Sequence, residues 1–126
     1  MRYPAKLIST MASTAVLIGS MCALLPGVAS ASEPTASDIA QGKALAFNRA
    51  EGNCLACHMI KGGNMPGDIG PPLVAMKARF PDREKLFAQI WDPRRNNPHT
   101  AMPPFGANHI LTKEQINKIV DFLYTL

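Results

Sequence analysis

Five consecutive residues carry the most informative chemistry of the chain: Cys54-Leu55-Ala56-Cys57-His58. Two thiols three positions apart lie on one face of a helical turn, where they can meet the two vinyl groups of one porphyrin. The histidine that follows then sits under the iron and can offer an imidazole nitrogen as an axial ligand. Because this spacing is typical of c-type haem attachment, we expect Cys54 and Cys57 to hold one haem c covalently and His58 to bind its iron.

A Cys-x-x-Cys pair also occurs in redox dithiols and as half of a zinc site. A structural zinc site needs about four ligands, and the sequence has no second pair of cysteines with this spacing. A thioredoxin-like dithiol belongs to a βαβ context, whereas the segments that flank Cys54 and Cys57 have helical patterns. The sequence therefore favours haem over both alternatives.

The opposite face of the iron needs a sixth ligand or stays open. The candidates downstream of the motif are Met59, Met65, Met76, His99, Met102 and His109. Met59 adjoins His58 and cannot reach the opposite face, while Met76 lies in a helical apolar run, where core packing is its simpler role. Two prolines follow Met102 and stiffen the loop around it, so a thioether can be held at one place. We expect Met102 to be the axial ligand, with His99 as the alternative.

The proposed ligand pair has a functional consequence. Histidine and methionine together fill both axial positions and raise the reduction potential of the iron. This favours electron transfer over oxygen or peroxide chemistry. The Gly70-Pro71 segment also offers a carbonyl that could accept a hydrogen bond from the second ring nitrogen of His58 and orient the ring. The alternative role of that segment is a simple turn.

The first 31 residues have the pattern of a secretory signal peptide. Arg2 and Lys6 give a charged start, an apolar run covers residues 7–25, and Ala29-Ser30-Ala31 fits the rule for cleavage after small residues. We expect cleavage after Ala31, leaving residues 32–126 as one mature cytochrome c domain in the periplasm with no membrane span. A retained membrane anchor is one alternative. A lipoprotein leader at Cys22 is another, disfavoured by the bulky Met21 before that cysteine.

Composition excludes several classes of function. Loss of the leader removes Arg2 and Lys6 and lowers the formal net charge of +4 by two, which is too little to indicate nucleic-acid binding. It also removes Cys22, so the mature chain has no cysteine outside the haem motif and no disulfide framework. Export and c-type haem attachment agree, because haem is joined to such motifs outside the cytoplasm.

The elements that must position these residues are predicted to be helices. We expect a first helix capped by Ser37 or Asp38 and ended by Gly52, a short helix over residues 73–80, and another from Asp82 to about Trp91. Gly42 inside the first helix is either the site of a close helix crossing or a glycine that the helix merely tolerates. A last helix follows the Thr112 N-cap, with Gln115 in a capping-box position. Because prolines and glycines fill the loops between them and no segment indicates a strand, the fold class is predicted to be all-α.

Taken together, these segments resemble class I cytochromes c over the whole mature chain. Within that class, the strings Pro66-Gly67-Asp68-Ile69-Gly70-Pro71-Pro72-Leu73 and Thr100-Ala101-Met102-Pro103-Pro104-Phe105-Gly106 resemble the small mono-haem subunits of SoxAX complexes, as do residues 110–112 and 119–123. The resemblance implies the class I cytochrome c fold around one haem c. It also implies thioethers at Cys54 and Cys57, and His58 and Met102 as axial ligands.

The resemblance also implies partners. In that family a larger haem subunit of the SoxA type binds thiosulfate and conjugates it oxidatively to a cysteine of the SoxYZ carrier protein, an L-cysteine S-thiosulfotransferase reaction. Electrons pass to the small subunit and on to a soluble cytochrome. This chain would be the electron relay and would contribute no catalytic residue. The alternatives are a free, diffusible class I cytochrome c serving an oxidase or reductase, and a haem sensor or peroxidase-like enzyme with an open sixth position.

Overall fold

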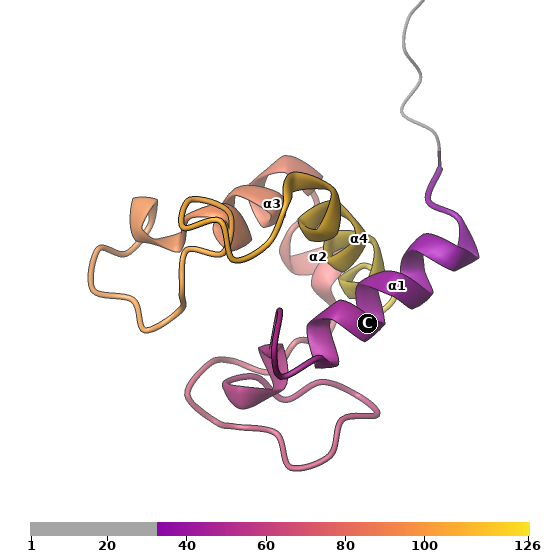
Figure 1. Ribbon diagram of the computed structural model, residues 1–126, viewed down its shortest axis with the longest axis horizontal. Helices are drawn as coiled ribbons and strands as arrows, with labels where there is room; N and C mark the ends of the chain where they lie inside the picture. The colour runs from indigo at the N-terminus through magenta and orange to yellow at the C-terminus, as the bar shows by residue number, and fades with distance from the viewer. Residues whose placement is uncertain (1–32) are drawn as a thin grey trace, which may run out of the picture. The chain divides into compact units, whose positions relative to one another are not determined.

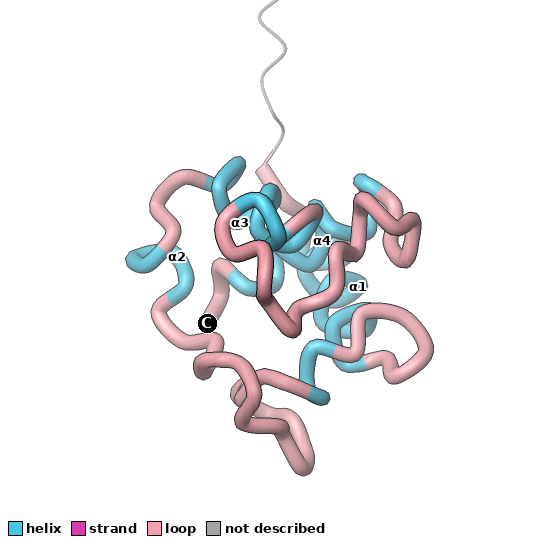
Figure 2. The backbone as a smooth tube through the Cα atoms, turned by 90° about the vertical axis from the view of Figure 1, so that its left-hand side faces the viewer, coloured by secondary structure: helices cyan, strands magenta, loops and turns pink. Residues whose placement is uncertain are grey.

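The computed structural model describes residues 33–126, and the leader predicted for residues 1–31 lies outside them. The elements in chain order are α1 (Ala36–Phe47), η1 (Cys54–Ala56), α2 (Met76–Arg79), α3 (Arg83–Trp91), η2 (Pro93–Arg95) and α4 (Lys113–Leu123), where η denotes a 3-10 turn. No strand occurs between residues 33 and 126, which confirms the all-α prediction (Figures 1 and 2).

Helix α1 begins earlier than its sequence pattern predicted. Thr35 is the N-cap: its side chain accepts a hydrogen bond from the backbone N–H of Asp38 at 3.1 Å, and the Asp38 carboxylate accepts one from the N–H of Thr35 at 3.3 Å. The prediction of Ser37 or Asp38 as the cap is therefore wrong, because Asp38 completes the capping box as its third helical residue. The helix also ends earlier than the predicted Gly52. Its last residue is Phe47, and Asn48 after it takes an extended conformation.

Helices α1 and α4 cross in close contact at Gly42. A β-carbon at this position would lie 1.8 Å from the carbonyl oxygen of Lys118, so only a glycine lets the two backbones approach this closely. Of the two alternatives for Gly42, the close helix crossing is therefore the correct one. Near the same interface the rings of Phe47 and Phe122 meet edge to face with their centroids 6.0 Å apart. The crossing buries Ile116, Ile119 and Val120 of α4.

The other helices follow their predicted signals to different degrees. Asp82 caps α3 by accepting from the N–H of Glu84 at 2.9 Å, and α4 begins with the predicted Thr112–Gln115 capping box. The helix predicted over residues 73–80 is shorter and covers only Met76–Arg79. Its N-cap, Ala75, has φ of 48°, a left-handed conformation that prevents the helix from extending further back.

Long loops connect these helices. The segment between η1 and α2 and the segment between η2 and α4 contain no helix; in Figure 1 the first lies below α1 and the second extends to the left of α4. None of the helices in residues 33–126 combines the length and apolar character needed to cross a bilayer. The core lies where α4 packs against α1 and α3, and it continues through Met76 of α2 and the loop residues Leu73, Phe105 and Leu111.

Candidate haem-binding site

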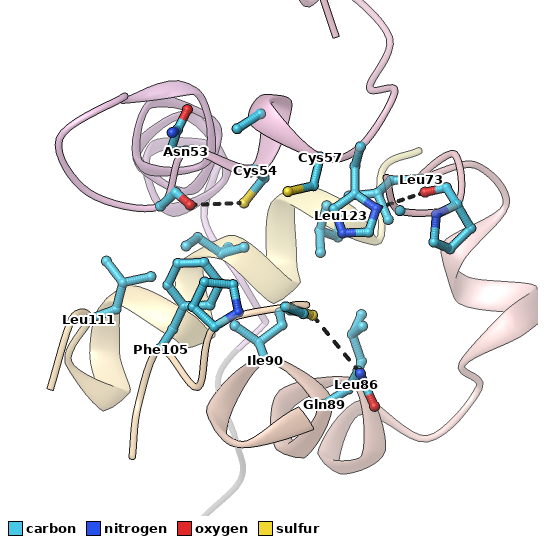
Figure 3. A pocket seen from close by; sticks show the side chains of 18 of the residues that line it. Asn53, Cys54, Cys57, Leu73, Leu86, Gln89, Ile90, Phe105, Leu111 and Leu123 are labelled. Carbon is cyan, nitrogen blue, oxygen red and sulfur yellow. Dashed lines mark hydrogen bonds between the residues drawn. The ribbon is translucent and has the colours of Figure 1, made fainter. Parts of the chain in front are cut away.

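A cavity of about 520 Å³ lies between the Cys54–Ala56 turn, helices α3 and α4, and the two long loops. Its wall is mainly apolar. Figure 3 shows Cys54 and Cys57 on one side of it, with Leu86, Gln89 and Ile90 of α3 facing them from across the cavity. The lining also includes His58, Ile69, Pro71, Leu73, Met76, Met102, Phe105, Ile110, Leu111, Ile119 and Leu123.

The turn that carries the cysteines is compact. Cys57 and His58 donate their backbone N–H groups to the carbonyl oxygen of Cys54 at 3.2 and 2.9 Å, so both thiols and the imidazole project from one short turn. Asn53 opens this turn in the left-handed region with φ of 45°, a conformation that asparagine tolerates better than most residues. Both cysteines are half-buried and free of disulfides.

The electrostatics of the cysteines disfavour a redox dithiol. Burial raises the pKa of the Cys54 thiol to about 11, so this group is a neutral thiol near pH 7. Reactive dithiols work instead through a thiolate whose pKa is lowered by its surroundings. A zinc site is disfavoured too, since residues 33–126 contain no cluster of three or more His, Cys, Asp or Glu side chains that could hold a metal ion.

His58 is fixed by a loop that runs along the turn formed by residues 54–58, which we call the haem turn. The backbone N–H groups of Gly67, Gly70 and Leu73 donate to the carbonyl oxygens of residues 55, 57 and 59 at 2.8, 2.8 and 2.9 Å. These bonds place the carbonyl oxygen of Pro71 at 2.7 Å from Nδ1 of His58, which confirms the predicted hydrogen bond. A β-carbon on Gly70 would lie 2.3 Å from Cε1 of the ring, so the loop backbone rests directly against the imidazole.

Met102 lies in the second long loop and also lines the cavity. Its N–H donates to the Thr100 hydroxyl at 3.1 Å. Further along the loop, the N–H groups of Gly106 and Ala107 both donate to the carbonyl oxygen of Trp91 at 3.1 Å, which ties the loop to the end of α3. The position of Met102 is therefore set by its own turn and by the end of the helix beside it.

The structure separates the other candidate ligands. Met59 and Met65 are 55% and 83% exposed, and neither they nor His99 or His109 line the cavity. Met76 does line it, but is only 2% exposed, and its sulfur accepts a hydrogen bond from Nη1 of Arg79 at 3.7 Å. Met76 thus packs in the core, as its sequence context indicated.

These residues fit a covalently bound haem. The cavity volume falls within the ~300–1,000 Å³ typical of sites for organic ligands, and its wall combines buried apolar side chains with few polar groups. Two thiols from one turn, an imidazole with an oriented ring and a thioether all reach it. This donor set matches the thiols and axial ligands that a c-type haem requires.

Sequence reasoning missed several polar residues of the cavity wall, among them Arg49, Arg79 and Gln89. Gln89 lines the cavity from α3, and its Nε2 atom donates to the sulfur of Met102 at 3.9 Å. The only available signal was a glutamine three residues after Leu86, next to the apolar face of that helix. Such a pattern indicates nothing until the fold brings residues 89 and 102 together.

Comparison with known proteins defines the class of protein. The family model for cytochrome c matches residues 39–126, so this chain belongs to the cytochrome c family. It is an electron-transfer cytochrome with a class I cytochrome c fold, and it carries covalently bound haem c.

Two individual proteins are similar to it. A chain in the crystal structure of SoxXA from P. pantotrophus superposes with a TM-score of 0.61 and 28% sequence identity, covering 68% of this chain and 79% of that one. An uncharacterised lipoprotein of Aquifex aeolicus (strain VF5) is 34% identical over 79 residues, 59% of this chain. The match covers only 36% of the length of that relative.

Proposed function

We propose that this chain is the mono-haem electron-transfer subunit of a periplasmic SoxAX-type complex. The observation that carries the proposal is the pairing of His58, held by Pro71, with Met102 in the wall of one apolar cavity. The similarity to a chain of the SoxXA structure supports the choice of complex, since it covers most of both chains.

Each site residue has a defined role in this proposal. Cys54 and Cys57 would hold the haem through thioether bonds, and His58 and Met102 would be the ligands of its iron. A carbonyl oxygen only accepts hydrogen bonds, so the bond to Pro71 requires the proton of His58 on Nδ1 and leaves the lone pair of Nε2 free for the iron. When bound, haem c supplies one-electron redox chemistry.

We prefer Met102 over Met76 as the sixth ligand because the two methionines lie on different sides of the cavity. The loop from Gly67 to Leu73 is bonded to the turn that carries His58, and Met76 follows that loop closely. Met76 is therefore tied to the histidine side of the cavity. Met102 comes from the separate loop that is anchored at the end of α3, so it can serve the opposite face.

The catalytic step of the complex is assigned to its partner. Within residues 33–126 the only cysteines are Cys54 and Cys57, which are committed to haem, so this part of the chain has no thiol left for sulfur chemistry. We therefore place thiosulfate binding on a SoxA-type haem subunit that forms a heterodimer with this chain and modifies the SoxYZ carrier. This chain accepts the released electrons and passes them to a soluble cytochrome.

The proposed location is the periplasm. Residues 1–31 form the signal peptide in this proposal, and residues 32–126 form the mature domain. The charged start, apolar run and small residues before position 32 support export. The name of the Aquifex aeolicus relative, a lipoprotein, also fits an exported protein.

The ligand assignment is tested with methionine variants of the purified haem protein. Met102→Leu is expected to abolish the red-region charge-transfer absorption of a ferric haem ligated by a thioether. Met59→Leu and Met76→Leu serve as matched controls, one exposed and one buried in the cavity wall, and both are expected to keep that absorption. Loss of the band in Met76→Leu with retention in Met102→Leu would reverse the assignment.

The partner assignment is tested by affinity capture. The tagged mature protein, loaded with haem, is used to recover partners from a periplasmic extract of its host grown on thiosulfate. Recovery of a larger haem protein in equal amount, followed by thiosulfate-dependent reduction of the pair in the presence of a SoxYZ carrier, is expected. Elution of the chain alone as a monomer would indicate a diffusible cytochrome c instead.

A further inference from the structure

The side chain of Gln89 makes two hydrogen bonds of different kinds at the edge of the cavity. Its Oε1 atom accepts from Nδ2 of Asn96 at 2.7 Å, and its Nε2 atom donates to Sδ of Met102 at 3.9 Å. Its helical neighbour Ile90 and the residue one turn before it, Leu86, are buried apolar residues of the same wall. Gln89 therefore brings a directed amide N–H to the thioether from a mainly apolar wall.

The Met102 sulfur requires the N–H end of the Gln89 amide to face it, and the bond from Asn96 to the other end holds the amide in that orientation. A thioether sulfur accepts hydrogen bonds and donates none. If both amides were turned over, Oε1 of Gln89 would face the sulfur and two acceptors would meet. The observed arrangement satisfies the short bond between the two amides and the weak bond to sulfur together. Because the bond to sulfur is weak, its geometry depends on the stronger bond to Asn96.

We propose that Gln89, oriented by Asn96, is a positioning residue that holds the Met102 thioether and raises the reduction potential of the site. The inference rests on the proposed role of Met102 as an axial ligand. An N–H that donates to the sulfur withdraws electron density from it, so the thioether stabilises the ferric iron less. The same contact restrains a flexible side chain with three rotatable bonds and so opposes its displacement.

The test compares five haem-loaded proteins: the wild type, Gln89→Leu, Asn96→Leu, the double variant of these two, and Gln41→Leu. The last is a matched control, because Gln41 lies on α1 outside this cavity. Gln89→Leu is expected to keep the thioether absorption band. Its reduction potential should fall. The expected fall corresponds to an equilibrium constant for reduction that is about three- to tenfold smaller, as for the loss of one modest hydrogen bond. Imidazole should displace its thioether at a lower concentration.

Asn96→Leu removes the hydrogen bond that holds the Gln89 amide without altering the cavity wall, because Asn96 does not line the cavity. It is expected to lower the reduction potential by less than Gln89→Leu does. Adding Asn96→Leu to Gln89→Leu is expected to lower the potential no further. If Gln89→Leu fails to accumulate as haem protein, Asn96→Leu alone decides the question. An unchanged potential and unchanged imidazole displacement in both variants would overturn the inference while leaving Met102 as the ligand.

The wild-type spectrum separates this inference from the proposal beneath it. Absence of the thioether band in the wild-type protein would overturn the assignment of Met102, and the role of Gln89 with it. Presence of the band with wild-type potentials in Gln89→Leu and Asn96→Leu would overturn the role of Gln89 alone. A shift in Gln41→Leu as large as that in Gln89→Leu would also contradict it, because the effect would then be unrelated to the sulfur.

Discussion

The imidazole of His58 and the carbonyl oxygen of Pro71, 13 residues apart in the chain, are joined by a hydrogen bond of 2.7 Å. Because the loop that carries Pro71 is itself bonded to the haem turn, the ring orientation is a property of the folded backbone. A bond of this kind also raises the basicity of a metal-binding histidine.

The contact between Gly70 and His58 gives the first prediction. Gly70→Ala would put a methyl group 2.3 Å from Cε1 of the ring, so the loop or the ring must move and the bond to Pro71 weakens. We expect a smaller haem-loaded fraction and a higher reduction potential, because a less basic imidazole stabilises ferric iron less. Potentiometric titration measures the reduction potential of this variant. Val74→Ala, at an exposed position in the same loop, is the control. A wild-type potential would show that the ring tolerates the methyl group.

Haem removal gives the second prediction. Without haem, the mainly apolar wall of the 520 Å³ cavity loses its packing partner and is exposed to water, which removes hydrophobic stabilisation. The total stability of a typical domain is only ~5–15 kcal/mol, so it tolerates little such loss. A Cys54→Ala/Cys57→Ala variant made without haem is therefore expected to be poorly folded by circular dichroism. Cooperative unfolding of this variant at the temperature of the haem protein would contradict the expectation.

The helix crossing at Gly42 gives the third prediction. Gly42→Ala places a β-carbon 1.8 Å from the Lys118 carbonyl oxygen, so α1 and α4 must separate. The expected loss in the free energy of unfolding is about 1–3 kcal/mol, or more, as for other overpacked interiors. Denaturant titration of the haem protein measures it, with Ala40→Ser on the exposed side of α1 as the control. Equal stability of the Gly42 and Ala40 variants would exclude a close crossing.

The capping box of α1 gives a prediction about pH. Hydrogen bonds from Thr35, and secondarily the charge of Lys118, lower the pKa of the Asp38 carboxyl below its usual 3.8. A group whose pKa is lower in the folded state contributes stability above its unfolded pKa and loses it as pH falls through the folded value. We expect Asp38→Asn to lower the melting temperature at pH 7, with a difference from wild type that shrinks below about pH 4. A difference that stays constant from pH 7 to pH 3 would mean that the carboxylate is not involved.

The backbone conformation of Ala75 gives the last prediction. This residue has φ of 48° at the start of α2, where an L side chain is strained and glycine is not. Ala75→Gly is therefore expected to stabilise the haem protein by up to about 1 kcal/mol. Ala78→Gly, inside α2, should instead destabilise it by about the same amount. Measured changes of the same sign in both variants would contradict the argument from strain.

Local signals in the sequence determined the haem motif, the all-α class and the Asp82 and Thr112 caps. Each depends on residues close together in the chain, where spacing alone sets the geometry. The bond between His58 and Pro71 was also predictable, because a rigid glycine–proline segment lies a short distance after the histidine. The errors lay at helix ends: Thr35 replaces Ser37 or Asp38 as a cap, and a left-handed Ala75 shortens α2.

Only the tertiary structure decided which side chains share the cavity. It placed Met102 in the wall, excluded His99, His109, Met59 and Met65 from it, and set Gln89 beside the Met102 sulfur with Asn96 behind it. These contacts join helix α3 to residues of the loops, and no periodic pattern in the sequence predicts such contacts. Their physical origin is the packing of the two long loops against α3 and the turn that carries His58, which backbone hydrogen bonds hold in place.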